Sequence, residues 1–478
     1  MNIKMLLWRD NYWLTRLVLQ RGLAIVYLIA FITVIHQFKP LLGESGLLPV
    51  PQFIKQVRFT ESPSIFFWFP ANFAFDLFGW IGVALSLFAL SGFSEKFGNL
   101  VSAVTWGALW LIYLSFVNVG QTFYGFGWET LLLEAGFLAI FLGSGKTTPL
   151  FLVIFLFNWL LFRVMFGAGL IKIRGDTCWR DLTCLQYHYE TQPMPNPLSW
   201  YFHWLPVWIH KTGVLFNHFI ELLVPFAYFA PSPIGAVAGL ITLFFQLWLF
   251  ASGNFSFLGF LTMVLALSTF SDSWLKRVIR IRPPELVPRS PFYLSVTLGI
   301  AVLVAALSFY PIRNMISPNQ IMNVSFDPLH LVNTYGAFGS ITRPRYEVIV
   351  EGTNDPVLAE ATRWREYEFI GKPGDVGRTP PQIAPYHLRL DWLMWFAAFS
   401  PPSQNPWFIS FLEKLLEGDK AVLALLRYNP FPDEPPKFVR ALLYEYHFTT
   451  PEERNRTGAI WNRKLIELYF PPVSLRGQ

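Results

Sequence analysis

The sequence predicts a multi-spanning α-helical membrane bundle of about nine spans, followed by a C-terminal α/β domain outside the membrane. Three observations predict this fold class. Of the 478 residues, 53% are hydrophobic and only 14% are charged, whereas soluble domains usually carry about 25% charged residues. The long apolar runs lie almost entirely within residues 1–311, and residues 312–478 have the mixed composition of an ordinary polar domain. We therefore expect two units, 1–311 and 312–478.

Nine segments approach the roughly 20 mostly apolar residues that a membrane span requires. They are residues 17–37, 73–92, 100–119, 128–143, 149–172, 212–230, 234–252, 255–271 and 292–311. The fourth is short and carries Glu129 and Glu134, which makes it a candidate re-entrant segment. Arg16 and Arg21 precede the first, and no small-residue cleavage pattern follows it, so we expect an uncleaved anchor.

Basic residues next to the spans predict the orientation of the bundle. They gather in the N-terminal segment and in the loop before the last span: Lys4, Arg9, Arg16 and Arg21, then Lys276, Arg277, Arg280, Arg282 and Arg289. Lys and Arg are enriched in cytoplasmic loops, and nine crossings place both regions on one side. The segment 173–211, here called the 173–211 hairpin, and the C-terminal domain then lie on the extracytoplasmic side.

The net charge of +6 is spread over short loops. Because no block of Lys and Arg could follow a nucleic-acid backbone, we expect no nucleic-acid partner. The sequence also has no G-x-S-x-G elbow, no Gly-rich phosphate loop and no H-E-x-x-H helix, which argues against an ordinary hydrolase or a nucleotide-driven transporter.

The C-terminal domain has the residue patterns of a mixed α/β fold. Residues 346–351 and 364–370 alternate apolar and polar side chains as half-buried strands do. Residues 407–426 have helical spacing, and residues 438–449 and 460–470 again favour strands. Residues 380–396 are unusually apolar for a soluble surface, which is typical either of docking on lipid or a partner, or of the domain's own core.

Lys172 ends the fifth apolar run and is the first candidate for chemistry. An ionisable group at the end of a span is a functional candidate by default, although a lysine there can also extend to the membrane surface. Within the sixth span, Asn217 and Glu221 share a helical face with His218 beside them. Such a polar stripe predicts either a proton-transfer or polar-ligand site, or a hydrogen-bonded contact between spans.

Glu129, Glu134 and Arg163 predict a structural ion pair, since an unpaired arginine inside the bundle would be too costly. Cys178 and Cys184 lie in one polar loop. A structural disulfide is favoured over a redox pair, which would prefer Cys-x-x-Cys, and over a zinc site with His188, which would need four ligands. We expect no metal.

Aromatic residues predict a client or ligand surface. His188 and Tyr189 lie in the hairpin, ahead of Pro193, Pro195 and Pro197. Trp200 and Tyr201 follow these prolines, and Trp392 and Trp395 lie in the C-terminal domain. This arrangement is typical either of a groove for an apolar ligand or of anchoring at the membrane interface.

Four long motifs resemble the lipase maturation factor family, and the similarity extends over nearly the whole chain. They are Trp128-Glu-Thr-Leu-Leu-Leu-Glu-Ala-Gly136, Trp179-Arg-Asp-Leu-Thr-Cys-Leu-Gln-Tyr-His-Tyr-Glu-Thr-Gln-Pro-Met-Pro-Asn-Pro197, Asn333-Thr-Tyr-Gly-Ala-Phe-Gly339 and Tyr386-His-Leu-Arg-Leu-Asp-Trp392. The resemblance implies a multi-spanning membrane protein that helps secreted lipases reach an active fold, with an outer domain that contacts the client.

A shorter segment, Phe166-Gly-Ala-Gly-Leu-Ile-Lys-Ile173 followed by Trp179, is similar to the membrane part of vitamin K-dependent carboxylases. The resemblance places Lys172 where those enzymes have the lysine that deprotonates a reduced quinone. It implies a quinone as a candidate substrate.

We prefer the interpretation of a maturation factor without a cofactor, whose partners are membrane lipids and a secreted client such as a lipase. The alternative is a membrane enzyme acting on a quinone or other lipid-soluble substrate, with Lys172 as general base and His218 and Glu221 as a proton relay. We expect the outer domain in the periplasm of a bacterium or in the lumen of the endoplasmic reticulum of a eukaryote.

Overall fold

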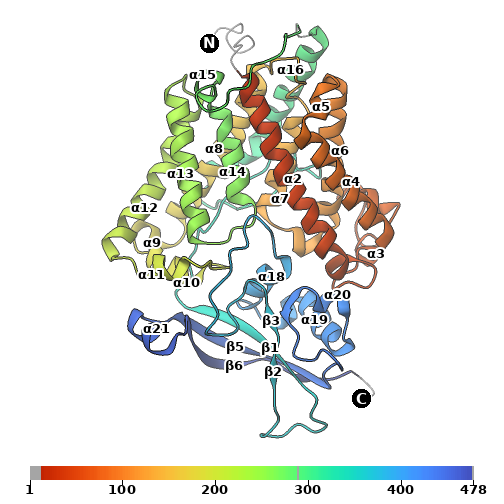
Figure 1. The fold of residues 1–478 in the computed structure, drawn as a ribbon, viewed down its shortest axis with the longest axis vertical. Helices are drawn as coiled ribbons and strands as arrows, with labels where there is room; N and C mark the ends of the chain where they lie inside the picture. Colours follow the sequence, from red (N-terminus) through yellow and green to blue (C-terminus); the bar gives the residue numbers. More distant parts are fainter. Residues whose placement is uncertain (1–11, 288–289, 476–478) are drawn as a thin grey trace.

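The computed structural model describes residues 12–287 and 290–475. Helices form the upper part of the molecule in Figure 1, and an antiparallel sheet with its own helices forms the lower part. Lys4, Arg9 and Arg289, which contributed to the predicted orientation, lie outside the described residues.

Seven helical segments of the described residues are long and apolar enough to cross a membrane. They are α2 (Trp13–Leu42), α4 (Asn72–Ser91), α6 (Asn99–Val119), α8 (Phe151–Arg174), α12 with η3 (Val207–Leu222 and Val224–Phe229), α13 (Ile234–Ser252) and α16 with α17 (Pro291–Leu307 and Phe309–Ile316). Each coincides with one of the nine predicted spans. A chain with this many apolar helices is an integral, multi-pass membrane protein.

The other two predicted spans form helices that are shorter. Residues 128–143 give α7 (Gly127–Ala139), and residues 255–271 give α14 (Leu258–Ala266) with η4 (Leu267–Thr269). All 13 residues of α7 are buried within the bundle, so its two glutamates face protein and not lipid. By length alone the count of nine spans is therefore not confirmed.

Both short helices nevertheless carry the chain from one end of the bundle to the other. Phe123, before α7, accepts a hydrogen bond from Arg389 of the C-terminal part, and Gly145, after α7, accepts one from Trp13 at the start of α2. In the same way Asn254, before α14, contacts Pro381, and Asp272, after it, contacts Leu14.

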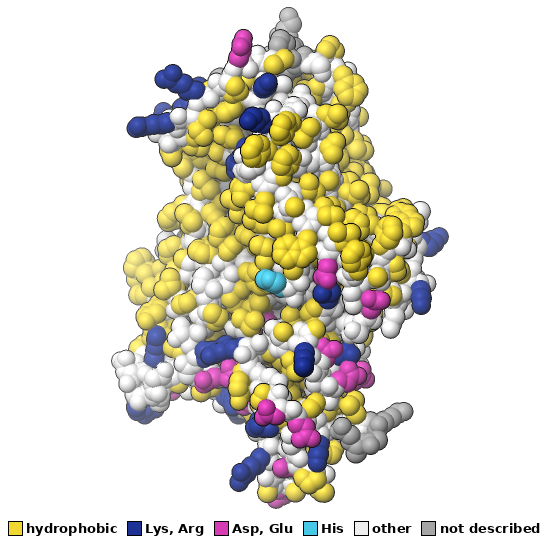
Figure 2. Space-filling model, turned by 45° about the vertical axis from the view of Figure 1, so that its right-hand side comes forward, with side chains coloured by type: hydrophobic (Ala, Val, Ile, Leu, Met, Phe, Trp, Pro, Cys, Tyr) yellow, Lys and Arg dark blue, Asp and Glu magenta, His cyan; other side chains and the backbone are white. Residues whose placement is uncertain are grey.

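The surface of the helical part is apolar. Figure 2 shows hydrophobic side chains covering it, whereas acidic and basic side chains gather over the lower part and basic ones at the upper end. The start of α2 and helix α15 (Asp272–Leu275) lie at that upper end (Figure 1). The basic loop that follows α15 therefore lies beside the N-terminal end of α2, as the nine-crossing arrangement predicts.

The lower part is built on a four-stranded antiparallel sheet with the order β2-β1-β5-β6. The strands are β1 (Arg345–Thr353), β2 (Arg365–Glu366), β5 (Phe438–Phe448) and β6 (Trp461–Val473). Ile349 lies opposite Leu442 in the β1–β5 register. These strands agree with three of the four predicted ones, and β6 forms one edge of the sheet.

Two predicted elements of this part are divided in the structure. The strand at 364–370 splits into β2 and β3 (Glu368–Phe369), and β3 pairs with β4 (Leu426–Tyr428) in a second small sheet. The helix at 407–426 splits into α19 (Pro406–Glu417) and α20 (Lys420–Leu423). Gly418 adopts φ +66°, which ends α19 because a left-handed residue cannot continue the helix.

Short helices complete the chain. The 173–211 hairpin contains α9 (Thr177–Arg180), α10 (Leu185–Thr191) and α11 (Ser199–His203), and it lies at the end of the bundle that faces the sheet (Figure 1). The others are α3 (Val50–Phe53), η1 (Ile65–Phe67), α5 (Phe93–Lys96), η2 (Gln121–Tyr124), α18 (Arg389–Ala397), η5 (Pro402–Gln404) and α21 (Pro451–Thr457).

Helix α18 explains the apolar stretch 380–396. It lies between the bundle and the sheet (Figure 1), where the Trp392 ring packs against Trp128 of α7 with ring centroids 4.9 Å apart. One continuous core contains buried residues from both sides of position 311. Most of the stretch is therefore internal core, and Phe396 at its end is exposed.

Candidate functional site

A cavity of about 730 Å³ lies where the helical bundle meets the 173–211 hairpin and the C-terminal part. Its walls come from the C-terminal half of α8, from α12 and α13, from the loop 322–340 and from α18. Most of the lining is apolar. A concave apolar site with a few polar groups is the usual form of a small-molecule site, and this volume lies in the ordinary range of about 300–1,000 Å³.

Lys172 and Glu221 meet inside this cavity. Lys172 Nζ lies 2.6 Å from Glu221 Oε1 and 3.1 Å from Asn217 Oδ1, and Asn217 Nδ2 donates to Glu221 Oε2 at 3.0 Å. Lys172 is only 5% exposed, and its ammonium group lies 5.1 Å from the centre of the Trp179 ring. The alternative that Lys172 extends to the membrane surface is therefore wrong.

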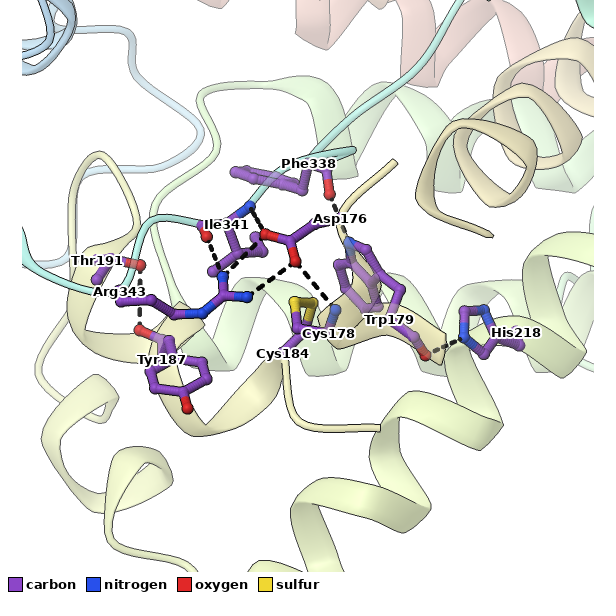
Figure 3. The surroundings of a disulfide bond; sticks show 10 residues. All are labelled: Asp176, Cys178, Trp179, Cys184, Tyr187, Thr191, His218, Phe338, Ile341 and Arg343. Carbon is purple, nitrogen blue, oxygen red and sulfur yellow. Dashed lines mark hydrogen bonds and ion pairs between the residues drawn. A yellow bond between two sulfur atoms is a disulfide. The ribbon is translucent and has the colours of Figure 1, made fainter. Parts of the chain in front are cut away.

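His218 does not join this group. Its Nε2 donates to the backbone carbonyl oxygen of Trp179 at 2.9 Å, on the side of the disulfide (Figure 3), and it is not among the residues that line the cavity. Successive residues of an α-helix are about 100° apart. Asn217 and Glu221 therefore share a face, whereas His218 is turned away, and the predicted proton relay lacks one of its members.

His188 lines the cavity as a neutral imidazole. It is 5% exposed, lies between the rings of Phe255 and Phe338, and its Nδ1 has no hydrogen-bond partner among the described residues. Burial, and then the nearby charge of Lys172, lower the pKa of His188 to about 3. Its ring is therefore an uncharged hydrogen-bonding group that faces the cavity.

The six predicted surface aromatic residues divide into two sets. His188, Tyr189, Trp392 and Trp395 line the cavity, and the first three are buried, so they are not available to a protein client in this structure. Trp200 and Tyr201 lie outside the cavity beneath the Arg454 guanidinium. Trp200 Nε1 donates to the Thr449 carbonyl oxygen at 2.8 Å, which joins the hairpin to the sheet domain, and Tyr201 is exposed.

Cys178 and Cys184 form a disulfide, and Figure 3 shows the contacts that surround it. Asp176 accepts a hydrogen bond from the Cys178 backbone N–H at 3.0 Å and two from the Arg343 guanidinium, each at 2.8 Å. These bonds hold the pKa of Asp176 well below its usual range. The disulfide turn is thereby attached to the segment that leads into β1.

The ion pairs of the bundle differ in part from the prediction. Arg163 forms a buried, bidentate pair with Glu134, and Tyr335 donates to the same carboxylate at 2.8 Å. The inclusion of Glu129 in this pair is wrong. Glu129 instead lies 2.8 Å from Arg389 Nη1, because α7 turns its first acidic residue toward α18.

The contacts between hairpin and sheet were missed by sequence reasoning. Buried Arg345 of β1 donates to the carbonyl oxygens of Glu190 and Gln192. The Glu190 carboxylate lies 2.8 Å from His447 Nδ1 and accepts from the Phe448 N–H at 3.0 Å. No local pattern identifies such partners, since they are more than 150 positions apart. Arg389 is different, because a lone arginine within the apolar stretch 380–396 is a recognisable signal.

In the part of the chain that the structure describes, no three His, Cys, Asp or Glu side chains are grouped so that they could hold a metal ion. The polar groups of the cavity are one paired lysine, one paired carboxylate, amides, hydroxyls, indole N–H groups and an imidazole. Such a set is suited to holding a small molecule by hydrogen bonds.

Comparison with known proteins identifies the relatives of both parts. Residues 14–277 match the family described as lipase maturation factor transmembrane domain, and residues 331–471 match the lipase maturation factor C-terminal domain. The chain is 44% identical to lipase maturation factor 1 of Mus musculus and of Homo sapiens, over 97% of this chain and 88% of each relative. It is 30% identical to lipase maturation factor 2 of Xenopus tropicalis, over 95% of this chain and 81% of that relative. No solved structure matches the chain.

Proposed function

Because this chain belongs to the lipase maturation factor family, we propose that it is an integral membrane maturation factor that helps secreted lipase-like proteins reach their active fold. The observation that carries this proposal is the similarity to lipase maturation factor 1 over nearly the whole length of both chains. The relatives supply the client class by their names. The fold is compatible with this role, because the sheet domain is attached to the membrane bundle by a shared core and by buried polar contacts.

We place the sheet domain and the 173–211 hairpin on the extracytoplasmic side. The described parts of the two basic regions lie at the opposite end of the bundle, with Arg16 and Arg21 at the start of α2 and residues 276–282 after α15 (Figure 1). Such regions mark the cytoplasmic side. The disulfide supports the same orientation, since disulfides persist in oxidising compartments. In a bacterial cell that compartment is the periplasm, and in a eukaryotic cell it is the lumen of the endoplasmic reticulum.

We propose that the client binds at the edge strand β6. Leu465, Ile466 and Leu468 of this strand are exposed, and the strand lies in the lower part of the molecule, away from the helical bundle (Figure 1). An apolar edge strand is a template for pairing with a second chain, and extended segments of a partner commonly add to such an edge. An incompletely folded client offers segments of this kind.

Co-expression with a dimeric secreted lipase tests this function. The chain raises the specific activity of the secreted lipase, and Leu465→Glu combined with Leu468→Glu lowers that gain about tenfold, the effect of removing two central contacts. The matched control is Val357→Glu combined with Leu358→Glu, which places the same charges on another exposed loop of the sheet domain. If the secreted lipase has the same specific activity in the presence and in the absence of the native chain, the proposed function is overturned.

The second candidate function is a membrane enzyme that acts on a quinone or other lipid-soluble substrate with Lys172 as general base. One observation favours it, namely that Lys172 and Glu221 both line the cavity. The geometry supports it less well, because Lys172 already donates to two acceptors. Lys172→Arg keeps the cation but removes an accessible base. Client activation that survives in this variant speaks against the enzyme, and its loss with normal membrane insertion speaks for it.

A further inference from the structure

We propose that the cavity beside Lys172 binds an uncharged amphiphile with one acyl chain and a hydroxyl-bearing head, the chemical class of a monoacylglycerol. The molecule would enter from the bilayer between α12 and α13, with its chain along the apolar walls and its head toward His188 and Lys172. This inference goes beyond the proposed function, because binding needs no client.

The position of the opening indicates a lipid source. Trp208 and Phe216 of α12, and Phe244 and Trp248 of α13, line the cavity. All four are also exposed on the outer surface, by 38% to 67%. These residues belong to segments with the length and composition of membrane spans. A molecule dissolved in the bilayer therefore reaches the cavity without passing through water.

The body of the ligand is apolar because most of the side chains that line the cavity are apolar. Val164, Ala168, Leu249 and Leu258 line the part of the cavity formed by α8, α13 and the start of α14. An acyl chain that enters from the bilayer exchanges one apolar environment for another, so these walls receive it without a penalty for contact with water. The volume of about 730 Å³ corresponds to one chain with a small head, since it lies within the range of single drug-sized ligands.

The head of the ligand is polar because hydrogen-bonding groups gather in the same cavity. Among the described residues the buried Nδ1 atom of His188 has no hydrogen-bond partner, which costs free energy unless a ligand or water supplies the bond. Gln246 is likewise buried, and its amide donates to the Met165 sulfur at 3.7 Å, a weak acceptor. Both residues line the cavity, and both can bond to hydroxyl or ester oxygens.

The ligand carries no net charge, because the cavity has no unpaired charged side chain that could neutralise a charged ligand. Among the described lining residues, Lys172 is the only lysine or arginine and Glu221 the only aspartate or glutamate, and they are paired with each other at 2.6 Å. His188 is neutral. A fatty-acid anion or a phosphate head would bring an uncompensated charge into an apolar site, which opposes its binding.

Photolabelling of the full-length chain tests the proposal. The purified protein in detergent is irradiated with a monoacylglycerol that carries a diazirine and an alkyne in its acyl chain, and the labelled peptides are identified by mass spectrometry. We expect labelling of the α12 and α13 residues that line the cavity, and competition by 1-oleoylglycerol at a concentration at least about tenfold lower than by oleate. His188→Phe, which keeps the ring but loses its nitrogens, should weaken competition about five- to tenfold, the value of one hydrogen bond.

A matched pair of tryptophan variants separates the cavity from the general surface. Thr212 lines the mouth of the cavity and Leu215 lies one turn further along α12, exposed but outside the lining. Thr212→Trp should abolish the competed labelling, and Leu215→Trp should leave it unchanged. Equal labelling of both variants would overturn the proposal, as would equal competition by oleate. Competition by a long-chain quinone but not by 1-oleoylglycerol would also overturn it and would support the enzyme.

Discussion

At the scale of single residues, each of the three buried glutamates that the sequence places within the spans has a cationic partner in the structure. Glu134 pairs with Arg163, Glu129 with Arg389 and Glu221 with Lys172. The need for a partner follows from the sequence, because an unpaired charge in an apolar interior is too costly. Which cation is the partner follows only for Arg163, since Arg389 comes from a different domain.

The Glu129–Arg389 pair allows a direct test of this argument. Arg389→Met leaves the Glu129 carboxylate without its main partner and should lower the free energy of unfolding by about 3–5 kcal/mol. The double variant Glu129→Gln with Arg389→Met removes both charges and should lose less. The measurement is denaturant unfolding of the purified protein in detergent. A double variant that is less stable than the single one would contradict the account.

The site at Lys172 was also predictable only in part, because local spacing does not identify side chains that come from distant parts of the chain. The spacing of Asn217 and Glu221 predicts that they share a helical face, and both accept hydrogen bonds from Lys172 in the structure. His218 was placed with them because it is adjacent in sequence, although adjacent helical residues point about 100° apart. The contribution of His188 to the same cavity was not predictable from spacing, since it lies 16 positions beyond Lys172, in a hairpin whose path no local pattern determines.

His447 makes the contact between hairpin and sheet dependent on pH. The hydrogen bond to Glu190 raises the pKa of His447 from 6.5 to about 9. The contribution of the protonated His447 and its bond to Glu190 to the free energy of unfolding is therefore complete below pH 6.5. It is lost as the pH rises toward 9 and the imidazole loses its proton. We expect the difference in stability between the native chain and His447→Gln to shrink over this window. Thermal unfolding at a series of pH values measures it, and a constant difference would contradict the assignment.

At the scale of elements, amphipathic patterns identified the strands well and the lengths of the short helices poorly. Strands β1, β5 and β6 lie within three residues of their predicted limits, because the alternation of apolar and polar residues is a local property of the sequence. Their burial was not predictable in this way, since β1 is buried along nearly its whole length and β6 is mostly exposed. The split of residues 407–426 at Gly418 depends on one backbone conformation. The shortness of α7 follows from the turn at residues 140–150, where the Ser144 backbone N–H and the Thr147 hydroxyl both donate to Asn99 Oδ1.

The disulfide turn is the element whose removal should affect function with the least effect on the bundle. Cys178 and Cys184 close a small loop with a sequence separation of 6, for which chain entropy gives about 2 kcal/mol. The double variant Cys178→Ser with Cys184→Ser should reduce client activation while membrane insertion is unchanged. Secreted lipase activity and membrane extraction measure the two effects. Normal activity in this variant would show that the disulfide has no role in maturation.

At the scale of the whole molecule, the motifs that are separated in sequence meet at the junction between bundle and sheet domain. The segment 128–136 contacts both 333–339 and 386–392 through Glu134 and Glu129, and the segment 179–197 contacts β1 and β5 through Glu190. The sheet domain is therefore attached to the bundle by buried polar contacts as well as by a shared core. The motifs that carry the family resemblance are in this sense structural.

At the same scale, the proposed function requires the sheet domain to lie on the side of the membrane where secreted clients fold. Single cysteines at two exposed positions test this most directly, because the native pair is bonded and does not react. Asn455→Cys lies in α21 of the sheet domain, and Arg280→Cys lies in the basic loop after α15. Sealed vesicles with the cytosolic face outward are treated with a membrane-impermeant maleimide. We expect labelling of Arg280→Cys at once and of Asn455→Cys only after detergent. Labelling of Asn455→Cys in sealed vesicles would contradict the account.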